Sequence, residues 1–117
     1  MVISQGEIYW VDMSEPRGSE PGYRHPYVII QNDAFNKSNI NTVLACALIS
    51  NIKLASSPCN VLLNKGDGNL PKASVVNISQ VATLNKTELK EKIGQLSKDK
   101  VAAIIDGINC IIKPRVI

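Results

Sequence analysis

The sequence contains no uninterrupted apolar run near the roughly 20 residues needed to span a bilayer. Its first residues also lack the basic region and apolar run of a signal peptide. We therefore expect a cytoplasmic protein with no membrane segment. Its 117 residues, 20% charged and 44% hydrophobic, exclude a disordered tail and fit one domain by the usual size. The composition predicts a single domain, 1–117, with one hydrophobic core.

The sequence is also poor in cysteine and in net charge. Its three cysteines, Cys46, Cys59 and Cys110, are odd in number and widely spaced, which predicts neither a disulfide framework nor a zinc site. Cys46 and Cys110 lie in apolar patterns, and we expect both to be small core residues. A net charge of +3 lacks the strong positive bias of proteins that coat duplex DNA. It still permits a nucleic-acid substrate or an acidic protein partner.

Short apolar runs separated by turn-forming residues fill the first two-thirds of the chain. The segment 14–22 carries two prolines and two glycines, which predicts a loop. The polar segment 32–41 predicts a loop or a broken helical turn. Many short strands joined by such turns are typical of a small barrel or sandwich. The predicted strands are 7–13, 27–31, 42–49, 59–63, 74–78 and 80–84. We expect the aromatic pair Tyr9 and Trp10 to be core residues.

The last third of the chain changes to a helical period. Asn85, followed three residues later by Glu88, fits an N-cap pair that opens a short helix. Ser97 caps a second helix, and Pro114 ends it. Gly107 within this helix predicts close packing against a neighbour. An apolar stripe at helical spacing predicts a core-facing side, with an edge available to a dimer, and consists of Val101, Ile104, Ile105, Ile108, Ile111 and Ile112.

The only histidine, His25, follows Arg24 where the loop 14–22 approaches the apolar stretch 27–31. Arginine carries a permanent charge on a planar fork that suits phosphate, and histidine can exchange a proton near neutral pH. The pair therefore suggests an acid–base site directed at phosphate. Taken alone, the two residues also fit a solvated surface loop.

Several segments, in order and at consistent spacing, resemble the MazF/PemK toxin endoribonucleases of bacterial toxin–antitoxin modules. They cover nearly the whole chain, so the resemblance does not depend on one motif. The segments are Gly6 to Asp12, Gly18-Ser19-Glu20 with Gly22, Arg24 through Pro26 to Asn32, Ser50-Asn51, Val75-Val76-Asn77 with Ser79-Gln80, and Lys92 to Ser97.

The resemblance implies a mainly β fold, an SH3-like small barrel of the CcdB/PemK type with a C-terminal helix, usually a two-fold dimer. It implies cleavage of single-stranded RNA at short specific sequences without a metal or cofactor. The 2′-hydroxyl attacks the neighbouring phosphate and leaves a 2′,3′-cyclic phosphate and a 5′-hydroxyl. The implied partner is a MazE-like antitoxin with an acidic, flexible tail, and contact with DNA occurs only through the antitoxin complex.

Two positions depart from the family pattern. Where the family usually has an arginine directly before the proline, this chain has His25, with Arg24 one residue earlier. Where the family usually has a threonine at the end of the third strand, this chain has Ile49. Ser50 is not an automatic substitute, because neighbouring residues of a strand face opposite sides.

Three interpretations of the catalysis remain open. In the first, Arg24 stabilises the phosphate, His25 acts as base or acid, and Ser50 supplies the missing hydroxyl. In the second, His25 points outward and Arg24 alone carries a slow reaction. In the third, Ile49 has left a protein that binds its antitoxin, with or without RNA, but cleaves poorly.

Further residues are candidates for RNA contact. Tyr23 can stack on a base, and Gln80 can read a base edge, although an anchored loop and a strand-end cap are the simpler interpretations. The full set of predicted RNA contacts is Gly18, Ser19, Tyr23, Asn51, Lys53, Ser79 and Gln80. Rival functions are a non-catalytic toxin homologue, acting through antitoxin and DNA autoregulation or by gyrase inhibition as CcdB-like relatives do, and a plain RNA-binding module.

Overall fold

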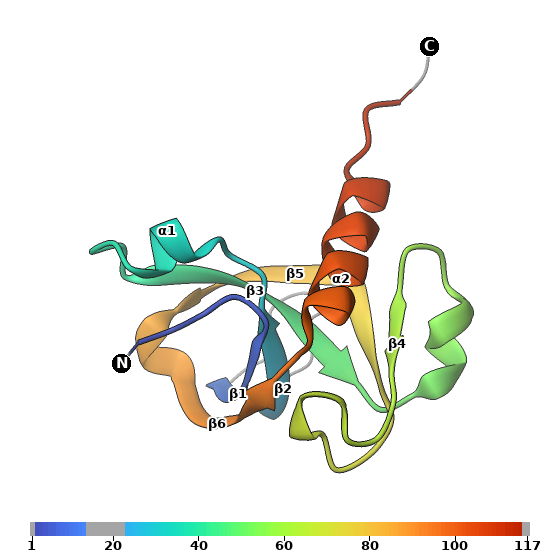
Figure 1. The fold of residues 1–117 in the computed structure, drawn as a ribbon, viewed down its shortest axis with the longest axis horizontal. Helices are drawn as coiled ribbons and strands as arrows, with labels where there is room; N and C mark the ends of the chain where they lie inside the picture. The colour runs from blue at the N-terminus through green and yellow to red at the C-terminus, as the bar shows by residue number, and fades with distance from the viewer. Residues whose placement is uncertain (1, 14–22, 116–117) are drawn as a thin grey trace.

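The computed structural model describes residues 2–13 and 23–115 and shows a curled antiparallel sheet with one long helix against it (Figure 1). Within these residues the sheet has six strands in the order β4-β5-β3-β2-β1-β6. No helix in the described part of the chain is long and apolar enough to cross a membrane. The elements are β1 (Glu7–Met13), β2 (Tyr23–Ile29), α1 (Asp33–Asn36), β3 (Thr42–Ile49), η1 (Ile52–Ser56), β4 (Val61–Leu63), η2 (Asp67–Asn69), β5 (Ser74–Asn85), η3 (Lys86–Glu88), β6 (Leu89–Gln95) and α2 (Lys98–Ile111).

Side chains of the strands alternate between the two faces of the sheet and form two buried clusters. The cluster beneath α2 includes Ile8, Val28, Cys46, Leu48, Val76, Ile78 and Ile104. The other cluster includes Tyr9, Val11, Tyr27, Ile29, Val43, Ala45 and Leu84. The two clusters hold the strands that carry the site described below.

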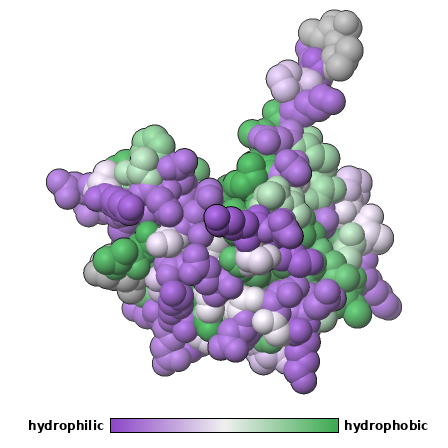
Figure 2. Space-filling view, in the orientation of Figure 1, coloured by the Kyte–Doolittle hydropathy of each residue, from purple (hydrophilic) through white to green (hydrophobic). Residues whose placement is uncertain are grey.

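The helix predicted after Ser97 is confirmed as α2. The hydroxyl of Ser97 accepts a hydrogen bond from the Lys100 amide at 3.3 Å, as an N-cap residue should. Ile104 is fully buried against the sheet, whereas Ile111 and Ile112 at the end of the apolar stripe are 44% and 69% exposed. Figure 2 shows hydrophobic side chains gathered along α2. The C-terminal end of the stripe is therefore surface in the single chain.

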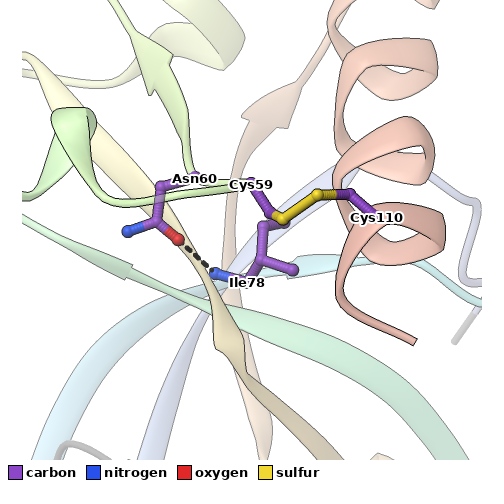
Figure 3. The surroundings of a disulfide bond; sticks show 4 residues. All are labelled: Cys59, Asn60, Ile78 and Cys110. Carbon is purple, nitrogen blue, oxygen red and sulfur yellow. Dashed lines mark hydrogen bonds between the residues drawn. A yellow bond between two sulfur atoms is a disulfide. The ribbon is translucent and has the colours of Figure 1, made fainter. Parts of the chain in front are cut away.

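The structure contradicts the prediction for the cysteines. Cys59 and Cys110 form a disulfide, with their Cα atoms 5.9 Å apart, and the bond joins the segment before β4 to α2 (Figure 3). The odd number of cysteines was misleading. Cys46 is buried and free as expected, so the two remaining cysteines can pair with each other. Cys110 lies in an apolar pattern but is exposed on α2. Its partner is 51 positions away, so local spacing carries no signal of the bond.

The same region shows the close packing predicted at Gly107. A Cβ atom added there would lie 2.5 Å from the carbonyl oxygen of Cys59. The Asn60 side chain accepts a hydrogen bond from the Ile78 amide at 3.0 Å (Figure 3). The segment before β4 is therefore fixed both to α2 and to β5.

The strand predicted at 27–31 begins four residues earlier than expected. β2 starts at Tyr23, and its first residues pair with β1. The proline at position 26 is tolerated because the ladder with β3 begins only at Tyr27, so no amide hydrogen is needed toward β3. Arg24 and His25 therefore lie within a strand, and the prediction that they lie at the end of a loop was wrong.

Two further differences concern the last strands. The predicted strands 74–78 and 80–84 form one strand, β5, and residues 77–80 fall opposite Ala47 alone at a register shift with β3. Polar residues in this stretch therefore mark an irregularity within a strand, not a turn.

The strand β6 is not predicted by the sequence pattern, because three consecutive charged residues in it interrupt any apolar alternation. It pairs with β1 at the edge of the sheet, where charged side chains are common.

Candidate active site

One pocket of about 220 Å³ brings together the three residues predicted to be catalytic, Arg24, His25 and Ser50. It lies where the start of β2 meets the end of β3, and parts of β1, β6 and the turn before β5 complete its walls. Its lining residues are Trp10, Arg24, His25, Pro26, Leu48, Ile49, Ser50, Leu70, Pro71, Lys72, Ser74 and Ile93.

The guanidinium of Arg24 lies over the indole ring of Trp10. Its central carbon is 5.0 Å from the ring centroid, within the range of a cation–π contact, which stabilises by about 0.5–1 kcal/mol at exposed sites. Its Nη2 is 4.0 Å from a carboxylate oxygen of Glu91, but that carboxylate side chain is 81% exposed, so the ion pair is weak. The indole ring thus helps to hold the guanidinium charge at the pocket wall.

A network around the buried Glu7 carboxylate lies at positions next in sequence to Trp10 and Glu91. The carboxylate of Glu7 lies 2.5 Å from the Lys92 ammonium and accepts a hydrogen bond from the Tyr9 hydroxyl at 3.0 Å. Burial, reinforced by this bond and the negative charge, raises the pKa of Tyr9 to about 12, so the phenol stays protonated and remains a donor. The network ties β1 to β6 at the positions next to Trp10 and Glu91.

The strand register sorts the predicted catalytic residues onto two faces. β2 and β3 pair at Val28–Cys46 and Tyr27–Ala47. Extending this antiparallel register beyond the last pair places His25 opposite Ile49 and Arg24 opposite Ser50. Because neighbouring residues alternate, Arg24 and Ser50 share one face and His25 and Ile49 the other. Within the described residues, no hydrogen bond engages the imidazole of His25 or the hydroxyl of Ser50.

The predicted RNA contacts are only partly placed by the structure. Gly18 and Ser19 lie outside the described residues, and Tyr23 begins β2. Asn51 directly follows Ser50, but its side chain accepts a hydrogen bond from the Lys53 amide at 3.2 Å and caps η1. Lys53 is exposed on that helical turn. Neither Asn51 nor Lys53 lines the pocket.

Ser79 and Gln80 lie in the irregular stretch of β5. Ser79 is exposed, and its hydroxyl donates to the side-chain oxygen of Asn77 at 3.3 Å. Gln80 is only 8% exposed. Neither residue lines the pocket, and their roles in reading RNA stay predictions.

Three polar or aromatic residues line the pocket without having been predicted from the sequence. Trp10 was expected in the core, but it is only partly buried and lines the pocket with Arg24. Lys72 comes from the turn before β5 and Ser74 is the first residue of β5, and both lie more than 20 positions beyond Ser50. Nothing in the local sequence joins that turn to β2, because only the sheet pairing brings them together.

Comparisons with known proteins identify the family. A family model described as a PemK-like, MazF-like toxin of type II toxin–antitoxin systems matches residues 4–112. The chain belongs to this family. Endoribonuclease MazF6 of Mycobacterium tuberculosis is 40% identical to this PemK/MazF-like toxin over 112 residues, which cover 96% of the chain and 98% of the relative. Endoribonuclease MazF2 of Mycobacterium bovis matches with the same identity and coverage.

Solved structures match the fold of this PemK/MazF-like toxin. MazF from Deinococcus radiodurans aligns with a TM-score of 0.79 at 21% identity, covering 97% of this chain and 99% of that chain. A mycobacterial endoribonuclease in complex with its cognate antitoxin aligns with a TM-score of 0.75 at 22% identity, with the same coverage. At these identities the likeness concerns the fold alone. The predicted small β barrel with a C-terminal helix is confirmed.

Proposed function

We propose that this toxin is an endoribonuclease that cleaves single-stranded RNA at short specific sequences without a metal ion. The observation that carries the proposal is the meeting of Arg24, His25 and Ser50 in one pocket. Relatives at 40% identity are named endoribonucleases, and a structural neighbour is described with its cognate antitoxin. A cognate antitoxin of the MazE type neutralises the enzyme, which acts as a homodimer and meets DNA only through the antitoxin complex.

The reaction needs a proton acceptor, a stabiliser of charge and a proton donor. The 2′-oxygen loses its proton and bonds to the adjacent phosphorus, the bond from phosphorus to the 5′-oxygen breaks, and the 5′-oxygen takes up a proton. The products are a 2′,3′-cyclic phosphate and a 5′-hydroxyl. Positioned proton transfer contributes about 10²–10⁴-fold to such reactions.

The pocket supplies each of these needs from its own residues. The Arg24 fork donates hydrogen bonds to the non-bridging oxygens, where negative charge increases. The Ser50 hydroxyl, on the same face, donates to the same phosphate. His25 transfers a proton to or from one of the bridging oxygens.

The test is cleavage of a long, mixed-sequence RNA by purified protein in EDTA, with the cut positions mapped. We expect discrete cuts at one short recurring sequence. No cleavage at any concentration of folded protein would contradict the proposal. That result would favour a homologue that binds its antitoxin without cutting RNA, the alternative supported by the apolar Ile49 in the pocket wall.

The first variant concerns proton transfer. His25→Ala should lower the cleavage rate and flatten its pH dependence between about pH 5 and 8, because the variant lacks the chain's only imidazole, the side chain suited to proton transfer near neutral pH. The measurement is a single-turnover pH–rate profile. His25→Asn is the matched control, since it keeps a polar side chain that does not titrate and should give the same flat profile. A His25→Ala profile with the wild-type shape would remove the residue from proton transfer.

The second variant restores the hydroxyl that the family usually has. Ile49→Thr should raise the cleavage rate roughly 10- to 100-fold, because a hydrogen bond to a charged group contributes about 1.5–3 kcal/mol. The extended β2–β3 register places position 49 opposite His25, and both positions line the pocket. Ile49→Val is the control, because valine matches threonine in shape and lacks the hydroxyl. Equal rates for the valine and threonine variants would show that the missing hydroxyl does not limit the reaction.

A further inference from the structure

The turn between η2 and β5 forms the wall of the pocket that carries Lys72. Leu70, before the turn, is 3% exposed, and Ser74, after it, is 6% exposed. Lys72 between them is exposed, yet it lines the same pocket as Arg24. A lysine is therefore presented to the pocket from a turn whose two ends are buried.

Hydrogen bonds fix the main chain of this turn. The Leu70 amide donates to the Asp67 carbonyl at 2.9 Å, and the Leu70 carbonyl accepts from the Gly66 amide at 2.9 Å. The hydroxyl of Ser74 donates to the carbonyl oxygen of Lys72 itself at 3.2 Å. The position from which the lysine side chain extends is thus held in place, while its four-carbon stem can still adapt to a ligand.

Two other lysines pair with carboxylates, whereas Lys72 does not among the described residues. Lys92 is paired with the buried Glu7, and Lys100 is 3.8 Å from Asp67. No carboxylate of the described residues lies within ion-pair distance of Lys72. Lys72 and Arg24 are the two basic side chains of lysine or arginine that line the pocket. Of these two, Lys72 has no carboxylate partner in the described part of the chain.

We propose that Lys72 binds a second phosphate of the RNA, next to the phosphate that Arg24 engages. This inference rests on the proposed function and adds a residue to its substrate site. Lysine binds phosphate as a point charge without the geometric demand of the arginine fork, which suits a phosphate that is held and not cleaved. Lys72 is therefore a substrate-binding residue, and its loss weakens binding more than it slows the bound reaction.

The experiment measures how RNA affinity depends on salt. The probe is an RNA carrying the sequence cut most strongly by wild-type protein, with a 2′-O-methyl ribose on the 5′ side of the scissile bond so that cleavage is blocked. A plot of log affinity against log salt has a slope that changes by about 0.7 for each phosphate contact with a single strand. We expect the Lys72→Ala slope to be shallower by about 0.7, with the slope restored in Lys72→Arg.

The matched control is Lys65→Ala, which removes an exposed lysine from the preceding turn that does not line the pocket. Its slope should equal that of wild type. An unchanged slope for Lys72→Ala, or an equal loss for both variants, would overturn the inference while wild-type cleavage leaves the proposed function standing. If wild-type protein neither cleaves nor binds RNA, the proposed function fails and this inference fails with it.

Discussion

Arg24→Ala is expected to slow RNA cleavage by at least about 10²–10³-fold, the usual cost of removing one well-placed donor to a developing oxyanion. The fold should remain intact, because the Arg24 side chain is 49% exposed and β2 pairs with β1 through its backbone. The measurement is a single-turnover cleavage rate at saturating protein, with circular dichroism and thermal unfolding to confirm the fold.

Arg24→Lys is the matched variant for this test. It keeps the charge but loses the planar fork and its stacking on the indole ring, so its rate should fall between those of wild type and Arg24→Ala. Trp10 is the only tryptophan in the sequence, and its fluorescence should change in both variants because the guanidinium lies 5.0 Å from its ring centroid. An Arg24→Ala protein with near wild-type rate would show that another group stabilises the phosphate.

Loss of the disulfide is expected to lower the free energy of unfolding by about 2–4 kcal/mol. The chain-entropy model gives about 4 kcal/mol for a loop closed over 51 residues, and measured values commonly fall below that figure. The measurement is urea unfolding of oxidised wild type, reduced wild type and Cys110→Ser. Reduced wild type and the variant should agree with each other and be less stable than the oxidised protein. Equal stability of all three would contradict a stabilising role for the bond.

A thiol count tests the same bond independently. The native oxidised protein should show no reactive thiol, because Cys46 is buried and its burial raises the pKa of the thiol to about 12. One thiol should react after unfolding, and all three after reduction and unfolding.

Disulfides are rare in the cytosol. Alkylation of the protein directly in cells would show whether the Cys59–Cys110 bond forms in the predicted cytoplasmic location.

The parts of the fold that the sequence predicts are those with a strong local period. The strand 42–49 has the same bounds in the structure, and Ser97 caps α2 as its position indicates. The start of β2 and the whole of β6 could not be predicted in this way, because their polar residues become strand only by pairing with β1. Strand pairing between distant segments is a tertiary effect that overrides local composition.

The residues of the candidate site also fall into two groups, those predicted from the sequence and those placed only by tertiary structure. Arg24 and His25 were predicted from their residue types and Ser50 from the family resemblance, and the pocket contains all three. Trp10 and Lys72 could not be predicted, because their place in the pocket depends on how β1 and the turn before β5 meet β2. The disulfide could not be predicted either, since its cysteines are brought together only by the seating of α2.

The most direct test of the central claim is the chemistry of the RNA ends at a single mapped cut. The proposed reaction predicts a 5′-hydroxyl on one product and a 2′,3′-cyclic phosphate on the other. It also predicts that a 2′-O-methyl group on the nucleotide before the cut abolishes cleavage. A 5′-phosphate product, or undiminished cleavage of the 2′-O-methyl substrate, would contradict attack by the 2′-hydroxyl and with it the roles given to Arg24, His25 and Ser50.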